Sequence, residues 1–210
     1  MQGSAFLQKG VLSFEEFILA GDNLVSKFWD WSWEEGDPEG KKPYSPAYNQ
    51  YLVCRNVPCL KRVVPVKEEC DAARAEADLF DSGPDPDIRT YDIGITYDNC
   101  YKTPRVWLMG FDVEGNILEP QLMFEDISQD NTQISVTVEY HPRMGPCATV
   151  HPCSHAAEMK KFIDVLMSRG IEPQVDMYLL IFLTSIVASV TPTIEYDCDL
   201  DIWAEQAAKP

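Results

Sequence analysis

Basic residues are scarce in this chain of 210 residues. Lys and Arg number 17 against 34 Asp and Glu, which gives a formal net charge of −17. This charge argues against nucleic acid as a partner and against electrostatic attraction to an anionic membrane surface. Basic protein surfaces suit such a chain better.

Dense cysteine patterns, targeting segments and long apolar runs are also lacking. The seven cysteines form an odd number without the density of a disulfide scaffold, and no signal peptide is recognisable. The uncharged stretch from Met177 to Val190 is shorter than the roughly 20 residues that a membrane span needs. We therefore expect a buried helix over about 174–190, a cytoplasmic protein and at least one free thiol.

Hydrophobic periodicity predicts an α+β fold. One helix is expected at "FEEFILAGD", with a capping box formed by Ser13 and Glu16 and an end at Gly21. A second is expected over 154–169, ended by Gly170. Strands are expected in "QYLVCRNV", "RTYDIGITYD", "RVWLMGFDV" and "ISVTVEY". Their short connections favour an antiparallel meander flanked by helices.

The strand "RTYDIGITYD" alternates apolar and polar residues, which predicts one buried face. The apolar face consists of Tyr91, Ile93, Ile95 and Tyr97. The tryptophans of "KFWDWSWEEG" are interpreted as a small aromatic cluster under a loop rather than as a ligand platform.

The chain is interpreted as a single core over residues 5–202 with a tail at 203–210. Residues 67–88, "KEECDAARAEADLFDSGPDPDI", are acidic, carry Asp-Pro and Pro-Asp turns and have few large apolar groups. This composition predicts a surface excursion rather than part of the core.

Two cysteines and two histidines crowd into "CATVHPCSH", where a strand-like run gives way to a helix. Cys147, His151, Cys153 and His155 are residue types that bind zinc, but their spacing lacks the separated pairs of structural zinc sites. A buried, inert cysteine is the general alternative. Cys153, however, follows Pro152 at the first turn of a predicted helix, where free N–H groups and the helix dipole favour a thiolate. The local pattern leaves these three interpretations open.

Several segments, in order, resemble the autophagy-related protein 3 family. They are "GVLSFEEFILAGDNLVSK", "RNVPCLKR", "RTYDIGITYD", "TPRVWLMGFD", "FEDISQD", "HPCSHAAEMKK" and "MYLLIFLTSIVASVTPTIEYD". Together they cover most of residues 5–66 and 88–198. Members of that family are ubiquitin-conjugating-type enzymes that attach a small ubiquitin-like autophagy modifier to phosphatidylethanolamine. The resemblance therefore implies a ubiquitin-conjugating-enzyme-like fold that needs no metal or organic cofactor.

The resemblance also implies a role for Cys153. This thiol would accept the modifier as a thioester from an activating enzyme and pass it to the amine of phosphatidylethanolamine. The implied partners are the modifier, its activating enzyme, the E3-like conjugate of autophagy and, transiently, a membrane containing that lipid. The protein itself would be a cytoplasmic monomer.

Supporting residues are suggested by the same resemblance. His155 matches the histidine after the family's cysteine, and Ser135 and Thr137 match its threonine-containing strand, where they either face the site or are exposed to solvent. The candidate supporting residues are His151, Pro152, His155, Ser135 and Thr137.

The chain departs from the expected pattern in three places. Ordinary ubiquitin-conjugating enzymes have a His-Pro-Asn motif before the cysteine, and "HPR" at His141 to Arg143 lies in about that place without the asparagine. Nothing before Ser4 forms the family's membrane-sensing amphipathic segment. Residues 67–88 occupy the place of a long acidic insertion but are much shorter.

Three other classes of protein remain as alternatives. A zinc-binding interaction module would hold stoichiometric metal. A cysteine hydrolase would need a base and an orienting partner near the thiol. A non-catalytic scaffold of the same fold would bind the modifier and never form a thioester.

Overall fold

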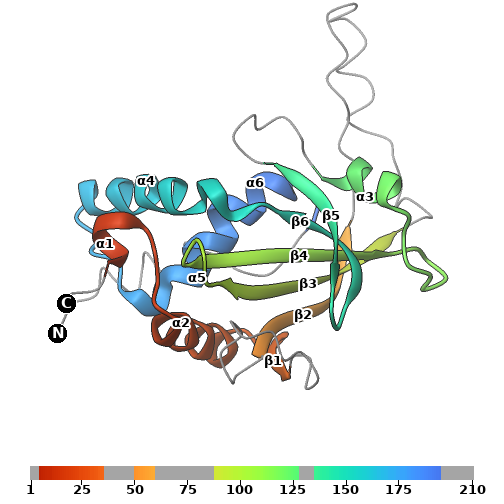
Figure 1. The fold of residues 1–210 in the computed structure, drawn as a ribbon, viewed down its shortest axis with the longest axis horizontal. Coiled ribbons are helices and arrows are strands. Elements are labelled where there is room, and N and C mark those ends of the chain that lie inside the picture. Colours follow the sequence, from red (N-terminus) through yellow and green to blue (C-terminus); the bar gives the residue numbers. More distant parts are fainter. Residues whose placement is uncertain (1–4, 36–49, 60–87, 128–134, 195–210) are drawn as a thin grey trace, which may run out of the picture.

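A computed structural model describes residues 5–35, 50–59, 88–127 and 135–194. It confirms the predicted α+β fold, in which an antiparallel sheet is flanked by helices (Figure 1). The predicted excursion at 67–88 lies outside the described residues except for Ile88. The predicted tail at 203–210 lies outside them entirely.

The described residues form a six-stranded sheet in the order β1-β2-β3-β4-β6-β5, with every neighbouring pair antiparallel. The strands are β1 Trp31–Glu35, β2 Gln50–Cys59, β3 Arg89–Asp98, β4 Thr103–Phe111, β5 Val136–His141 and β6 Gly145–Val150. β2, β3 and β4 are consecutive neighbours, as in the predicted meander. The meander prediction is wrong for β5, which pairs with β6 instead of β4, and it did not include β1. The β5–β6 hairpin joins the sheet through its second strand, so β5 forms the edge beyond β6.

The β5–β6 hairpin folds across the sheet face that the helices leave uncovered. The register between β4 and β6 covers two residue pairs, after which the hairpin leaves β4 and crosses β3 and β4 in Figure 1. The imidazole of His141 thereby lies 5.0 Å from the rings of both Tyr51 on β2 and Trp107 on β4. A second, smaller core forms between hairpin and sheet.

This hairpin explains an error in the predicted exposure of β3. The predicted apolar side is right, because Tyr91, Ile93 and Ile95 are fully buried against the helices. The expectation of a single buried face is wrong, since Asp92 and Gly94 on the other side are also buried. Gly94 leaves room for Met144 of the hairpin, whose sulfur would lie 2.6 Å from a Cβ at that position.

Helices cover the sheet face opposite the β5–β6 hairpin and enclose the main core. The longer ones are α2 Phe14–Lys27 and α4 His155–Ser168, and the short ones are α1 Phe6–Lys9 and α3 Pro120–Asp126. In Figure 1, α1 lies beside α4 at one end of the molecule and α3 lies at the other. Met159 and Ile163 of α4 are buried as its period predicts, and Gly170 after it has a φ of +80°. Phe162, which the i, i+3, i+4 spacing places on the same side as Met159 and Ile163, is 38% exposed.

Helix α2 begins as predicted but ends later. The side chains of Ser13 and Glu16 form the expected capping box. The predicted end at Gly21 is wrong, because the helix continues to Lys27. A glycine within a helix costs about 1 kcal/mol relative to alanine, but here the indole of Trp33 fills the space, and a Cβ on Gly21 would lie 2.1 Å from its Cζ2.

The aromatic cluster predicted around "KFWDWSWEEG" contains two of its three tryptophans. Trp31 is buried and Trp33 packs edge-on against Phe17 at 5.8 Å, both from strand β1 rather than from a loop. Trp29 is 93% exposed.

The last helical stretch confirms the prediction of a buried helix over about 174–190. It consists of η2 Val175–Met177, α5 Tyr178–Phe182, the π-helical turn η3 Leu183–Val187 and α6 Ala188–Val190. Most of its side chains lie in the main core. Within the part of the chain that the structure describes, no helix has both the length and the apolar character to span a membrane.

Candidate active site around Cys153

Cys153 lies where β6 gives way to α4, in the 3-10 turn η1 Pro152–Ser154. The β5–β6 ladder makes its last bond here, from the backbone N–H of His151 to the carbonyl of Ser135 at 2.9 Å. Pro152 has no N–H with which to continue the ladder and its ring is buried, so the chain turns into the helix. Cys153 itself is exposed.

The imidazole of His151 is half-buried beside Cys153. Its Nδ1 accepts a hydrogen bond from the backbone N–H of Cys153 at 3.3 Å. Its ring packs edge-on against Tyr101 of the β3–β4 turn, with centroids 5.4 Å apart. Among the predicted supporting side chains, His151 is the one that bonds directly to the backbone of Cys153.

His155 points away from solvent and into the core. Its side chain is fully buried, Nδ1 donates to the carbonyl of Pro104 at 3.0 Å, and the ring packs on Phe182 at 5.3 Å. Burial lowers its pKa from 6.5 to about 4, so the ring is neutral near pH 7. His155 therefore anchors the start of α4 to β4.

Ser135 and Thr137 lie on the β5 side of the site. Ser135 stands opposite His151 in the extended ladder and is exposed. Thr137 pairs with Thr149 of β6, and its hydroxyl donates to Glu139 at 3.0 Å. The two residues share one side of the strand, as alternation predicts.

A polar row behind Thr137 joins three strands. Arg105 of β4 donates from Nε to Thr149 at 3.1 Å and forms an ion pair with Glu139 at 2.5 Å. Its guanidinium also lies over the ring of Trp107, 4.5 Å from the centroid. The row fixes β5 and β6 against β4 next to the Cys153 turn.

The "HPR" motif lies at the other end of β6 from Cys153, in the β5–β6 turn. The six residues of β6 separate the two, which is roughly 20 Å of extended chain. His141 is buried there, and its Nδ1 accepts from the backbone N–H groups of Arg143 and Met144 at 3.3 and 3.1 Å. Arg143 donates to the carbonyl of Glu35 at 3.2 Å. The motif thus shapes the hairpin turn.

The four residues considered for zinc do not share one side of the sheet. Cys147 lies in the small core under the hairpin, where burial raises its pKa to about 12, whereas His155 packs on Phe182 in the main core. Within the described ranges, no three His, Cys, Asp or Glu side chains gather as a metal would require.

Sequence reasoning missed two contributors to the site, Tyr101 and Arg105. Both lie about 50 residues before Cys153, in the β3–β4 turn and on β4. Their positions depend on the pairing of β4 with β6, which no local pattern encodes. The quoted segment "TPRVWLMGFD" contains Arg105 but gives no sign of its partners.

Most of the described fold matches the model of a known family. A family model described as "Autophagocytosis associated protein, active-site domain" matches residues 16–198. A curated relative called "Autophagy-related protein 3" from Arabidopsis thaliana is 40% identical over 282 residues, which cover 94% of this chain and 90% of the relative. Relatives of the same name are 32% identical in Dictyostelium discoideum, covering 94% and 91%, and in Schizosaccharomyces pombe, covering 92% and 90%.

This chain is shorter than the region of the relative with which it aligns. The alignment with the Arabidopsis thaliana protein spans 282 positions, although this chain has 210 residues, so at least 72 positions (282 − 210) are occupied by the relative alone. This agrees with a shortened insertion. Its placement at 67–88 stays a prediction.

Proposed function

Because this chain belongs to the autophagy-related protein 3 family, we propose that Cys153 carries a ubiquitin-like autophagy modifier as a thioester and transfers it to phosphatidylethanolamine. The coarser assignment, a conjugating enzyme of autophagy, follows from the family. One observation supports the finer one most strongly. Cys153 is an exposed thiol at the start of a helix, within the residues that match an active-site domain.

The proposed reaction has two steps at one sulfur. The Cys153 thiolate attacks the thioester that links the modifier to its activating enzyme, forms a new C–S bond and releases the activating enzyme's thiol. The amine of phosphatidylethanolamine then attacks the same carbonyl. An amide forms, the C–S bond breaks, and the Cys153 sulfur leaves with the electron pair while the amine loses a proton. No redox partner is needed.

The neighbouring residues are proposed to present the thiol. The fixed φ of Pro152 and the buried ring set the direction in which Cys153 leaves the sheet. His151 holds the Cys153 amide through Nδ1. His155 contributes indirectly, because its hydrogen bond to the carbonyl of Pro104 anchors the first turn of α4.

Ser135 and Thr137 are proposed to face the incoming thioester or amine. Ser135 is exposed directly opposite His151, and Thr137 lies one step further along the same side of the strand. The Ser135 hydroxyl can donate to the carbonyl oxygen that becomes negative during transfer, and the Thr137 hydroxyl can do so only after it releases Glu139.

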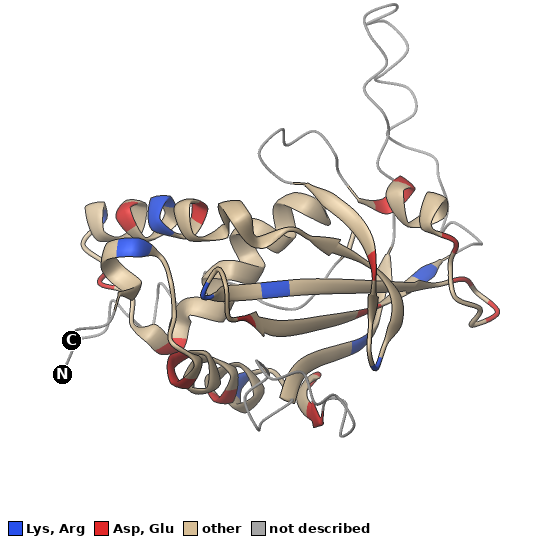
Figure 2. Cartoon of the chain, viewed as in Figure 1, with Lys and Arg blue, Asp and Glu red and all other residues tan. Residues whose placement is uncertain are grey.

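The proposed partners are the modifier, its activating enzyme, the E3-like conjugate and a membrane containing phosphatidylethanolamine. We propose that the protein works as a monomer in the cytoplasm and visits autophagic membranes transiently. Figure 2 shows Lys and Arg interleaved with Asp and Glu along the described chain, as in the Lys160–Asp164 and Lys161–Glu158 pairs of α4. Recruitment is therefore assigned to protein partners rather than to charge attraction by lipid.

A charging assay tests the carrier. Wild type, Cys153→Ser, Cys100→Ser and Cys147→Ser are incubated with activating enzyme, modifier and ATP and separated on a non-reducing gel. We expect a thiol-sensitive adduct in wild type and a thiol-resistant oxyester in Cys153→Ser. Cys100→Ser is the matched control, since Cys100 is also exposed, and it should charge like wild type.

The scaffold alternative predicts a different gel. A modifier-binding scaffold would give no adduct in any variant while still retaining the modifier in a binding assay. An adduct that persists as a thioester in Cys153→Ser would place the carrier on another cysteine and refute the assignment.

A further inference from the structure

Tyr101 has no part in the reaction proposed above, yet it is the aromatic side chain that touches His151. The two rings meet edge-on, with an interplanar angle of 77° and centroids 5.4 Å apart. We propose that Tyr101 is a positioning residue, which fixes the imidazole of His151 and thereby the backbone of Cys153. This inference rests on the proposed role of Cys153 and adds a residue to it.

The turn that carries Tyr101 is held firmly. The carboxylate of Asp98 accepts the backbone N–H groups of Cys100 and Tyr101 at 2.9 and 3.0 Å. Lys102 has a φ of +55°, a conformation that non-glycine residues keep where their surroundings enforce it. Its carbonyl accepts the N–H of Leu12 at 2.9 Å, which ties the turn to the N-terminal segment. The ring of Tyr101 is thus presented from a fixed backbone.

The contact matters because His151 works in one orientation. Its Nδ1 accepts the N–H of Cys153, so Nδ1 must carry no proton and the ring must keep one of its two flip states. The χ2 rotation of a histidine is broad, and this ring is only half-buried. The Tyr101 ring, packed edge-on against the imidazole, restricts that rotation.

Removal of the Tyr101 ring is expected to make the position of the Cys153 thiol less fixed. Without Tyr101, the imidazole samples other orientations and the Pro152–Ser154 turn loses its link to Nδ1 for part of the time. Small misplacements of a reacting group lower rates steeply, so we expect Tyr101→Ala to accept and transfer the modifier about tenfold more slowly. Tyr101→Phe keeps the ring and should restore most of the rate.

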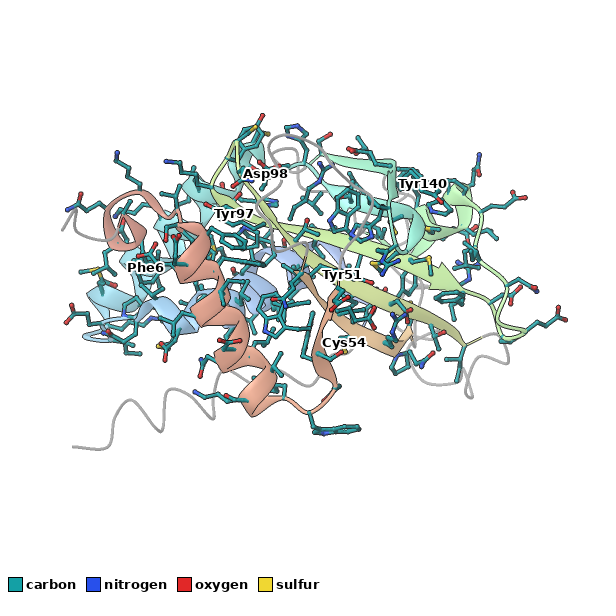
Figure 3. All side chains as sticks on the ribbon, turned by 60° about the horizontal axis from the view of Figure 1, so that its bottom comes forward. Phe6, Tyr51, Cys54, Tyr97, Asp98 and Tyr140 are labelled. Atoms are coloured by element: carbon teal, nitrogen blue, oxygen red, sulfur yellow. The ribbon has the colours of Figure 1, made fainter. Side chains whose placement is uncertain are left out.

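A double-mutant cycle tests whether Tyr101 acts through His151. Single-turnover charging rates are measured for Tyr101→Ala, His151→Ala and the double variant, with thermal unfolding to verify that each is folded. We expect the double variant to be no slower than His151→Ala alone. Tyr140→Ala serves as the matched control, because Tyr140 is 74% exposed and lies away from Asp98 (Figure 3), on β5 near the hairpin turn.

A second readout does not depend on the modifier. Nitrogen chemical shifts of the His151 ring in the full chain report which ring nitrogen carries the proton. We expect a single tautomer, with the proton on Nε2, in wild type and Tyr101→Phe, and a mixture in Tyr101→Ala. Additive rate losses in the cycle, or ring shifts unchanged by Tyr101→Ala, would overturn the proposal. Absence of charging in wild type would instead count against the role of Cys153 as carrier. The ring shifts would still show whether Tyr101 fixes the imidazole of His151.

Discussion

His151 and His155 are four residues apart, but their rings have opposite surroundings. His151 lies at the surface against Tyr101, and His155 is fully buried between Pro104 and Phe182. His151 therefore accepts a hydrogen bond from the backbone of Cys153, whereas His155 packs in the main core. Of the two histidines that flank Cys153, one is a candidate site residue and the other anchors α4 to β4.

Burial of His155 predicts a stability that depends on pH. Its pKa is lowered from 6.5 to about 4 chiefly by burial. Between these values the unfolded chain binds more protons than the folded one, so the free energy of unfolding falls as the pH drops from about 6.5 to about 4. Each unit of the difference in pKa corresponds to about 1.4 kcal/mol.

Chemical denaturation of wild type and His155→Asn at pH 7 and pH 5 tests this statement. Asparagine can still donate to the carbonyl of Pro104, so the variant should fold with a shallower loss of stability at acid pH. His141, whose pKa burial also lowers to about 4, accounts for part of the slope that remains. Equal slopes for wild type and His155→Asn would show that His155 titrates normally in the folded protein.

One buried carboxylate of helix α3 bonds directly to the sheet. Asp126 is fully buried and accepts from the hydroxyl of Tyr91 at 2.6 Å and from Arg89 at 3.1 Å. Its neighbour Glu125 pairs with the same arginine at 2.8 Å, but its side chain is 51% exposed. The two acids of α3 thus differ in burial and share a partner.

That difference gives a matched pair of variants. Asp126→Ala leaves Arg89 and the Tyr91 hydroxyl without their buried acceptor, and removal of one buried charge partner costs about 3 to 5 kcal/mol. Glu125→Ala removes an exposed partner and should cost less than about 1 kcal/mol. Urea unfolding measures both. Similar losses would contradict the assigned role of burial.

The N-terminal segment docks on α4 through a close backbone approach. Gly10 has a φ of +66°, and a Cβ there would lie 2.2 Å from the carbonyl oxygen of Ala156. The carbonyl of Gly10 also accepts the hydroxyl of Tyr178 at 2.7 Å. Gly115 has a similar φ of +83° with open space around it.

We therefore expect Gly10→Ala to destabilise the fold much more than Gly115→Ala. Both substitutions place an alanine in the left-handed region at a cost of about 1 to 2 kcal/mol. Gly10→Ala adds a collision with backbone, for which overpacking costs of about 1 to 3 kcal/mol are typical. Thermal unfolding compares them, and equal shifts in Tm would show that the N-terminal segment simply moves away from α4.

At the scale of the whole molecule, local patterns predicted the longer helices and strands β2 to β5, but they missed α1, α3 and β1 and the contacts that cover the predicted elements. The capping box of α2, the buried last helix and the apolar side of β3 follow from spacing alone. The continuation of α2 past Gly21 depends on Trp33, and the burial of Asp92 depends on a hairpin more than 40 residues away. Neither contact has a signature in a short window of sequence.

The site divides in the same way. The position of Cys153 at a helix start, with Pro152 before it, was predicted from the residues themselves, whereas its exposure was not, because a buried and inert cysteine remained an open alternative. The different burial of His151 and His155 could not be predicted, because it depends on which element packs on each side of the β6–α4 junction. The role of "HPR" in the hairpin turn likewise depends on the length and direction of β6.

The acidic character of the whole chain bears on how it would reach its substrate. With a net charge of −17 and both lysines of α4 paired with acids, the described surface offers little attraction to anionic lipid. The proposed contact with a membrane would then be brief, and the proposed transfer step would occur during it. The lipid amine, rather than binding energy for the bilayer, is the feature that drives the proposed reaction.

A single-turnover chase tests this central claim most directly. The protein is charged with modifier, the activating enzyme is stopped by removal of ATP, and vesicles with or without phosphatidylethanolamine are added. The account predicts that Cys153 loses its modifier faster on vesicles with that lipid and that mass spectrometry finds the modifier as a lipid amide. Equal loss on phosphatidylcholine vesicles, with free modifier as the product, would contradict it.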